Sequence, residues 1–295
     1  MLDGERAGRV LVRGHRLYYR RFGTGARGTV LVLHGGPGLT HDYLLPMADL
    51  AVHGYGVVLY DQFGCGSSGR PRTYRTVTIQ EAAADADALR RALRLGRVHL
   101  YGHSYGGALA LETALRFPRG WRSLLVSGGF ASMDALWRGL RRRLAELSAP
   151  SRRALVQEDE DGISTRASRR ADEEFRQRFS HHLRNVPYEV WRTYRRANPR
   201  VSAAMGMSAR HTLRDGYRTG TLAGWDVTGE LGRIRLPTLL TVGEFDHVHP
   251  DVVRAIHRGI PGARFALARG EGHLPMFEAR DRYISQLRGF LDAVG

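Results

Sequence analysis

The stretch VHLYGHSYGGALALETALRFP, residues 98–118, decides the fold of this chain. β-branched and aromatic residues open it, a glycine-rich turn follows, and apolar residues then recur at helical spacing. This pattern predicts a strand over 98–101 and a helix over 105–117. The turn, residues 102–106, reads GHSYG and fits the pattern G-x-S-x-G. Its serine, Ser104, is either an ordinary turn residue or an exposed nucleophile. The residues in the other loops distinguish these two interpretations.

Length and composition restrict the class of protein. The chain has 295 residues, of which 42% are hydrophobic and 25% charged, enough for one large domain or two small ones. The chain contains no run of eighteen apolar residues, so no membrane span is predicted. The opening residues 1–6 lack the apolar core of a signal peptide, so we expect a cytoplasmic protein. The single cysteine, Cys65, excludes an internal disulfide framework and is interpreted as a small packing residue.

The formal net charge of +16 is the feature that could suggest nucleic-acid binding. Every basic residue other than histidine is an arginine, and the arginines are spread over the whole chain. They are densest over residues 138–200, where acidic residues are interleaved with them. A solvated surface rich in ion pairs explains this pattern without a nucleic acid. We therefore expect no specific nucleic-acid partner and no membrane, only a small-molecule or short-peptide substrate, with the oligomeric state left open.

Strand-like and helix-like segments alternate along most of the chain, which predicts an α/β fold with a mostly parallel sheet. The alternation stops over 132–220, an arginine-rich, helix-like stretch that we interpret as a cap inserted into a core made of 1–131 and 221–295. Two early strands are expected around the turn at 13–14. The other predicted strands cover 29–33, 55–61, 98–101, 123–129, 237–242 and 263–269, and the predicted helices cover 78–96, 105–117, 251–258 and 277–294.

The loops that follow the predicted strands carry the residues needed for acyl transfer. Ligands of open parallel sheets bind beyond the carboxyl ends of the strands. Ser104 is the nucleophile candidate, and a serine hydroxyl needs a base. His273, in a glycine-rich loop between the last strand and the last helix, is the candidate base, and Asp246 would orient it. The order Ser–Asp–His along the chain is the order of the α/β-hydrolase fold. Glu244 is the rival acid.

A second glycine loop, HGGPG, follows the strand 29–33. In this kind of site, one backbone N–H from such a loop and one from the residue after the nucleophile stabilise the oxyanion. Gly36 and Tyr105 are the candidates for these two donors, and Gly35 beside them is a candidate for contact with the substrate. The loop DQFGCGSS, residues 61–68, is interpreted as scaffolding for the site.

Taken together, the motifs HGGPG, DQFGCGSS, GHSYGG, GEFD and GEGH resemble those of the proline-iminopeptidase family of serine peptidases. Within that family the chain is similar to the tricorn-associated aminopeptidases, over nearly its whole length and least in the cap. The resemblance implies an α/β-hydrolase core, a helical cap, a triad of Ser104, Asp246 and His273, and cleavage of an N-terminal aminoacyl amide.

The chain departs from that family where the resemblance implies glutamates that grip the free amine of the substrate. One such position lies late in the cap, where this chain reads MSARH over 207–211, and the other follows the catalytic aspartate, where His247 stands. A bound ammonium needs compensating negative charge or good acceptors. Glu174 and Glu244 are candidates for this role, with Glu173 and Asp215 as further ones, and each could equally be a surface carboxylate.

Aromatic residues of the cap region are candidates for an apolar acyl pocket. Trp191 and Tyr217 are the first of them, and Trp137, Tyr194 and Trp225 are further ones. The adjacent pair His181 and His182 would point apart on a helix and has no suitably spaced third ligand, so we expect no metal and no cofactor.

The sequence therefore favours a serine hydrolase that cleaves an amide to release an N-terminal aminoacyl group, from a short peptide or an aminoacylated small metabolite. An esterase or lactonase using the same triad on a substrate without a free amine is the alternative, and the missing glutamates favour it. A binding protein that keeps the fold without catalysis is the third hypothesis.

Overall fold

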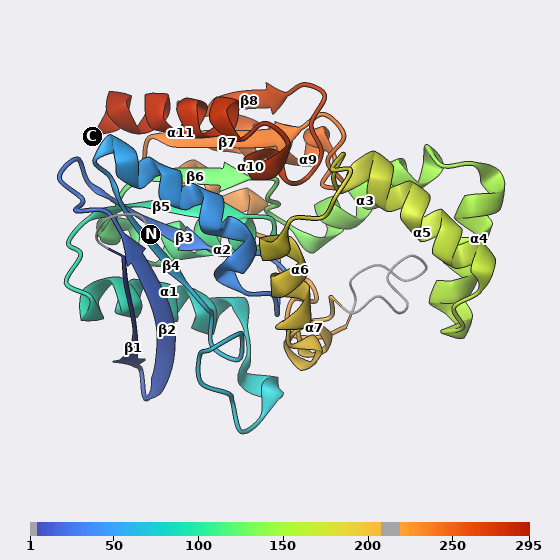
Figure 1. Ribbon diagram of the computed structural model, residues 1–295, viewed down its shortest axis with the longest axis horizontal. Helices are drawn as coiled ribbons and strands as arrows, with labels where there is room; N and C mark the ends of the chain where they lie inside the picture. The colour runs from blue at the N-terminus through green and yellow to red at the C-terminus, as the bar shows by residue number, and fades with distance from the viewer. Residues whose placement is uncertain (1–4, 208–218) are drawn as a thin grey trace.

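Eight strands form one sheet at the centre of the molecule, in the spatial order β1-β2-β4-β3-β5-β6-β7-β8 (Figure 1). The structure is a computed structural model that describes residues 5–207 and 219–295. The strands are β1 (Arg6–Val12), β2 (His15–Phe22), β3 (Thr29–Leu33), β4 (Gly56–Tyr60), β5 (Val98–His103), β6 (Trp121–Ser127), β7 (Thr238–Gly243) and β8 (Arg264–Ala268).

The sheet is parallel from β4 to β8 and antiparallel only at β2, which pairs with both β1 and β4. Every residue of β3, β4, β5 and β7 is buried, which explains why these strands read as continuous apolar runs rather than as alternating ones. The predicted α/β fold with a mostly parallel sheet is confirmed.

Helices cover both faces of the sheet, and alternate residues of each strand point to opposite faces. In β5, Leu100 joins the apolar cluster on one side and Tyr101 joins the cluster on the other. The first cluster is closed by α1 (Ile79–Ala92), α2 (Tyr105–Arg116), α9 (Pro250–Gly259) and the 3₁₀ segment η4 (Thr228–Arg233). The second is closed by the 3₁₀ segment η1 (His41–His53), α10 (Pro275–Glu278) and α11 (Arg280–Val294).

Five α-helices lie between β6 and β7 in the described part of the chain, all within the stretch expected to form a cap. Figure 1 shows α3, α4 and α5 extending away from the sheet, while α6 and α7 stay beside the core. Their bounds are α3 (Met133–Ala145), α4 (Ala149–Asp161), α5 (Arg166–Phe179), α6 (Tyr188–Arg195) and α7 (Pro199–Ala204). Whether 132–220 marks the limits of a separate domain stays a prediction.

Helix ends differ from the predicted ones where the local backbone turns. Thr78 caps α1 through the backbone N–H of Glu81, but the helix ends at Ala92, before Gly96. A single predicted helix over 277–294 is two helices, because the backbone breaks at Ala279 between α10 and α11. Short 3₁₀ turns also occur as η2 (Tyr74–Thr76) and η3 (Pro118–Gly120).

The two glycines of G-x-S-x-G are required by close backbone packing. A Cβ on Gly102 would lie 2.0 Å from the carbonyl oxygen of Gly106, and a Cβ on Gly106 would lie 2.2 Å from the carbonyl oxygen of Leu33. Neither neighbour is a flexible side chain, so neither can move aside without shifting β3, β5 or α2. The motif is therefore a packing constraint that holds the start of α2 against the ends of two strands.

Gly106→Ala should consequently destabilise the fold by about 3 kcal/mol, since an atom would be forced into the backbone of β3. Gly289→Ala, within α11, is the matched control, because nothing lies within 4 Å of a Cβ there. Alanine is the better helix former, so the control should gain about 0.5–1 kcal/mol. Urea unfolding of both variants measures the difference, and equal stabilities would contradict the packing argument.

Candidate active site

Ser104 occupies a strained turn between β5 and α2. Its backbone has φ 58° and ψ −127°, a conformation rare for any residue with a side chain. Such a residue costs about 1–3 kcal/mol and persists only where the surroundings enforce it. The N–H of Ser104 donates to the carbonyl of Ser127 at 2.9 Å, which ties the turn to the end of β6. The turn places the serine directly before α2, where the backbone N–H groups at the start of the helix favour negative charge.

Asp246 and His273 come together from two loops at the same edge of the sheet. Asp246 follows β7, His273 follows β8, and Nδ1 of His273 lies 2.7 Å from Oδ1 of Asp246. The same oxygen accepts the N–H of Val248 at 2.7 Å. The N–H of His273 donates to the carbonyl of Ser180 at 2.7 Å, so the imidazole is oriented from both its ring and its backbone. Both side chains are buried.

Burial sets the protonation of this pair. Desolvation lowers the pKa of His273 to about 3, so its imidazole is neutral at pH 7 and can accept a proton. Burial also raises the pKa of Asp246, while the nearby His247, the Val248 N–H and Arg143 favour the ionised carboxylate. With Nδ1 of His273 donating to that carboxylate, Nε2 is the ring atom left to act as a base.

Two backbone N–H groups at this edge have no hydrogen-bond partner in the described part of the chain. They belong to Gly36, in the loop after β3, and to Tyr105, the first residue of α2. A Cβ on Gly35 would lie 2.9 Å from the Cβ of Ser104, so the loop passes directly against the nucleophile candidate. The arrangement has the form of an oxyanion hole, and the assignment of Gly36 and Tyr105 to it stays a prediction.

His34 fixes the conformation of that loop from beneath. Its Nδ1 donates to the carbonyl of Gly35 at 2.9 Å, and its Nε2 accepts the N–H of Gln62 at 3.0 Å. The side-chain amide of Gln62 returns a hydrogen bond to the carbonyl of His34 at 2.7 Å. Burial lowers the pKa of His34 to about 4, which keeps the ring neutral and able to donate and accept at once.

A buried hydrogen-bond chain connects the oxyanion loop to the loop that carries the base. The N–H of Gly35 donates to the hydroxyl of Tyr43 at 2.7 Å, and this hydroxyl lies 3.0 Å from Nδ1 of His103. Nε2 of His103 lies 2.7 Å from the carbonyl of His273, which can only accept. Burial lowers the pKa of His103 well below its ordinary value. The neutral ring therefore donates through Nε2 and accepts the Tyr43 proton at Nδ1.

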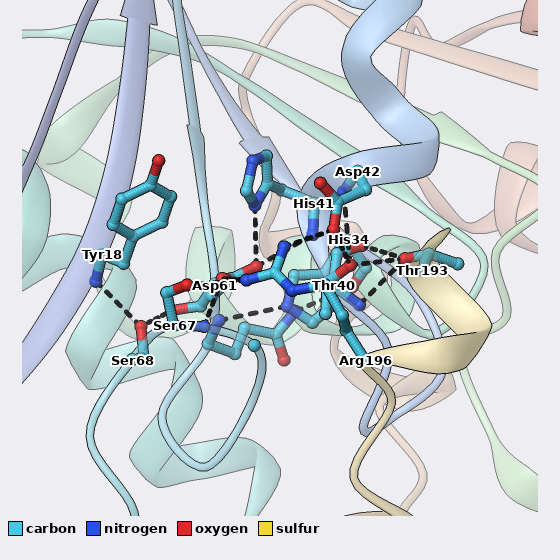
Figure 2. A network of polar contacts seen from close by, with 12 residues as sticks. Tyr18, His34, Thr40, His41, Asp42, Asp61, Ser67, Ser68, Thr193 and Arg196 are labelled. Atoms are coloured by element: carbon cyan, nitrogen blue, oxygen red, sulfur yellow. Dashed lines mark hydrogen bonds and ion pairs between the residues drawn. The ribbon is translucent and has the colours of Figure 1, made fainter. Parts of the chain in front are cut away.

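Figure 2 shows the polar network that attaches α6 of the cap region to the core. The buried carboxylate of Asp42 accepts Nη1 of Arg196 at 2.6 Å and lies 3.2 Å from Nε of Arg192. The hydroxyls of Thr40 and Thr193 lie 2.6 Å apart. A buried carboxylate is tolerated when it is paired and hydrogen-bonded, so these contacts fix α6 over the loop that follows β3.

Asp61 belongs to the same network in Figure 2. One carboxylate oxygen accepts the backbone N–H of His41 at 3.0 Å and lies 2.7 Å from its Nδ1. The other oxygen accepts the N–H of Ser67 at 2.7 Å. The hydrogen bonds and charge of His41, together with the Ser67 N–H, overcome burial and hold the pKa of Asp61 well below its usual range. Its contacts are structural, in keeping with the scaffolding role expected for residues 61–68.

Two residues that the sequence analysis did not single out support the acid. Arg143, on α3, is buried and donates through Nε to the carbonyl of Asp246 at 2.9 Å. Gly128, just after β6, has φ 53°, and a Cβ there would lie 2.7 Å from Oδ2 of Asp246. Arg143 lies within an arginine-rich stretch, and nothing in its spacing separates it from solvated neighbours.

A cavity of about 270 Å³ opens over Ser104 and His273. Its other walls come from the loop after β3, from η1, from α6, and from the loops after β7 and β8. No aspartate or glutamate is among the described residues that line it, and His103 and His247 are kept neutral by burial, which lowers the pKa of His247 to about 3. The lining residues besides Ser104 and His273 are Gly36, Pro37, Leu39, Tyr43, His103, Val190, Thr193, Tyr194, Ser202, His247 and Leu274.

The acidic candidates for binding an amine lie elsewhere. Glu244 accepts the backbone N–H of Gly270 at 3.0 Å, and Glu174 accepts the hydroxyl of Ser151 at 2.6 Å. Neither lines the cavity. His247 does, with its ring centroid 3.9 Å from that of His273.

The aromatic candidates for the acyl pocket do not gather in the cavity. Trp191 lies on the outer side of α6 with 48% of its surface exposed, beside rather than inside the cavity. Trp225 is buried and donates to Glu112 at 3.0 Å, as a core residue does. Tyr217 and Asp215 lie outside the described residues.

One group of potential metal ligands occurs in the described residues. Ligand atoms of Asp246, His247 and His273 lie within 4.8 Å of one another. Nδ1 of His273 is already committed to the carboxylate of Asp246. His182 is directed to the carbonyl of Gly270 at 3.1 Å, whereas His181 lies against Arg176. The expectation of no metal stays a prediction.

Comparison with known proteins identifies the class. Residues 28–280 match the family model described as the alpha/beta hydrolase fold. Two proteins called proline iminopeptidase are similar over almost the whole chain. The one from Saccharolobus solfataricus is 33% identical over 95% of this chain and 90% of its own length. The one from Thermoplasma volcanium is 35% identical over 97% of this chain and 96% of its own length.

A solved structure agrees with this assignment. The crystal structure of a proline iminopeptidase from Mycobacterium smegmatis superimposes with a TM-score of 0.90 and 28% identity, covering 98% of each chain. This chain is therefore an α/β hydrolase, and it is an enzyme. Within that class it belongs to the proline-iminopeptidase family. No described helix is both long enough and apolar enough to cross a membrane.

Tyr43→Phe tests the hydrogen-bond chain. The variant leaves the buried N–H of Gly35 without an acceptor, which should destabilise the protein by about 1–3 kcal/mol. It should also lower kcat about tenfold or more with little change in KM, because one oxyanion donor contributes about 3 kcal/mol. Tyr101→Phe is the control, since its buried hydroxyl lies 2.8 Å from that of Tyr283 and outside this chain. Equal effects of the two variants on kcat would refute the connection.

The pH dependence follows from the neutral base. A base with its pKa lowered by burial to about 3 becomes protonated only in strong acid. Protonation of His273 should thus cause no fall in kcat/KM at the ordinary histidine pKa of about 6.5, and any fall that it does cause should lie at lower pH. A pH–rate profile with a parallel circular-dichroism check of folding measures this. An acid limb centred near pH 6.5 would contradict it.

Proposed function

We propose that this chain hydrolyses an amide bond to release an N-terminal aminoacyl group, from a short peptide or an aminoacylated small metabolite. The observation that carries the proposal is a cavity lined by the strained Ser104, by Gly36 and by His273, whose ring is hydrogen-bonded to Asp246. The names of the two relatives that match over 95% and 97% of this chain direct it to aminoacyl amides.

Acylation begins with the hydroxyl of Ser104. Its oxygen attacks the substrate carbonyl while Nε2 of His273 takes the hydroxyl proton, and Asp246 stabilises the imidazolium that forms. The carbonyl oxygen becomes negatively charged and accepts hydrogen bonds from the N–H groups of Gly36 and Tyr105. The C–N bond then breaks, and His273 passes its proton to the departing amine.

Deacylation repeats the sequence with water. His273 takes a proton from the water molecule as it attacks the ester that links the acyl group to Ser104. The second tetrahedral intermediate collapses, the proton returns to the oxygen of Ser104, and the aminoacyl group leaves as a free amino acid. The buried chain through Tyr43 and His103 keeps the two loops in register during both steps.

A second candidate is an esterase or lactonase that uses the same residues on a substrate without a free amine. One observation favours it: the described lining of the cavity carries no carboxylate, and its imidazoles are neutral. A cationic amine would have no opposite charge there to offset its loss of hydration.

A substrate panel separates the two. It compares aminoacyl nitroanilides, their N-acetylated counterparts, and simple nitrophenyl esters and lactones, with Ser104→Ala as the control. The first proposal expects a kcat/KM at least about tenfold higher with the free amine than with the acetylated amide, a difference of about 1.4 kcal/mol. Equal turnover with and without the amine, together with efficient ester cleavage, would replace it with the second candidate.

Labelling by a fluorophosphonate probe tests what both candidates share. The wild-type protein should react at Ser104 and the Ser104→Ala variant should not. Absence of labelling in the folded wild-type protein would overturn both candidates and leave the binding-protein hypothesis.

A further inference from the structure

A second hollow, of about 770 Å³, opens beside the catalytic cavity. Its lining residues come from α5, in the part of the cap region that extends away from the sheet, from α6 beside the core, and from the segment between them (Figure 1). Val190, Tyr194 and His247 line both hollows, so the two are neighbours. Because the ring of His247 packs on that of His273, the second hollow begins one residue away from the candidate base.

Exposed aromatic and aliphatic side chains form the wall of this hollow. Val186, Trp191 and Tyr194 have 46%, 48% and 67% of their surfaces exposed, and Phe175 of α5 lines the same hollow. Large apolar side chains gathered at a concave surface gain stability when a ligand removes them from water. The described wall would thus favour a flat apolar group.

An uncompensated positive charge lies on the same wall. The guanidinium of Arg195 stacks over the ring of Trp191, 4.8 Å from its centroid, and has no carboxylate partner in the described residues. Arg176 also lines the hollow but is paired with Glu173. Asp172 is the one carboxylate among the described lining residues. A guanidinium that is flat, stacked and unpaired is suited to a carboxylate next to an aromatic ring.

We infer that this hollow binds the leaving group of the substrate and selects a planar apolar group that carries a carboxylate. The inference rests on the proposed function for the scissile bond, since the acyl half then occupies the cavity over Ser104. The amine that departs with the proton from His273 would lie across Trp191, with its carboxylate on Arg195. The C-terminal residue of a short peptide, when aromatic, has this chemistry.

The kinetic test uses amides of one amino acid with methylamine, naphthylamine and aminonaphthoate. For each substrate, the ratio of variant to wild-type kcat/KM cancels the intrinsic reactivity of the bond. Arg195→Gln should lower the aminonaphthoate ratio about tenfold and the naphthylamide ratio less than about twofold. Trp191→Ala should lower both about tenfold and leave the methylamide nearly unchanged.

Two variants serve as matched controls. Arg141 stacks over Trp137 at 4.9 Å with the same sequence spacing as Arg195 and Trp191, but neither lines the hollow. Arg141→Gln should therefore leave all three substrates unchanged. Ile163→Ala removes a side chain that is 65% exposed away from the hollow, and it controls for Trp191→Ala.

The rate of deacylation distinguishes the two halves of the substrate. All three amides form the same acyl-enzyme, so a leaving-group subsite has no influence after the amine has left. Trp191→Ala should leave this rate unchanged. A slower deacylation in that variant would assign the hollow to the acyl group and overturn the inference.

A binding measurement keeps the inference separate from catalysis. Calorimetry with aminonaphthoate and the Ser104→Ala protein should give binding that Arg195→Gln weakens about tenfold, and weaker binding of naphthylamine. Equal affinities for the two amines, or tighter binding of a cationic naphthylamine through Asp172, would overturn the inference. If these affinities follow the expectation but the fluorophosphonate probe does not label Ser104, the subsite stands and the proposed function fails.

Discussion

The contact between the start of α2 and the end of β3 is the constraint on which the site depends. Gly106 lies against the backbone of Leu33 with no room for a side chain, and Gly102 lies equally close to Gly106. This packing forces Ser104 into positive φ and brings the loop after β3 to within contact of its Cβ. Strain at one serine and the placement of a potential oxyanion donor thus have a common cause.

Much of the fold and the centre of the site could be predicted, because both depend on short-range patterns. Apolar runs that end in glycine loops indicate buried parallel strands, and the residues that follow them must meet at one sheet edge. Asp246 and His273 do meet there, although 27 positions separate them along the chain. The helix break at Ala279 was missed because the apolar spacing continues across it.

The supporting residues could not be predicted, because their partners are distant along the chain. His103 contacts Tyr43 at a separation of 60 positions and the carbonyl of His273 at a separation of 170. Arg143 reaches Asp246 over 103 positions, from a stretch in which most arginines are solvated. Spacing along the sequence gives no sign of such contacts, which arise only when η1 packs on the sheet and α3 packs against α9.

The attachment of α6 has a consequence for how selectivity and rate can vary. The same short helix carries Val190 and Tyr194, which line both hollows. It also carries Arg192, which holds Asp42 together with Arg196, the residue that follows the helix. Asp42 follows the HGGPG loop by a few positions. The helix that covers the cavity and the loop that carries a potential oxyanion donor are therefore held by the same carboxylate. A substitution at that anchor would therefore change substrate selectivity and reaction rate together. A substitution on the outward side of α6 could change selectivity without changing the rate of the chemical step.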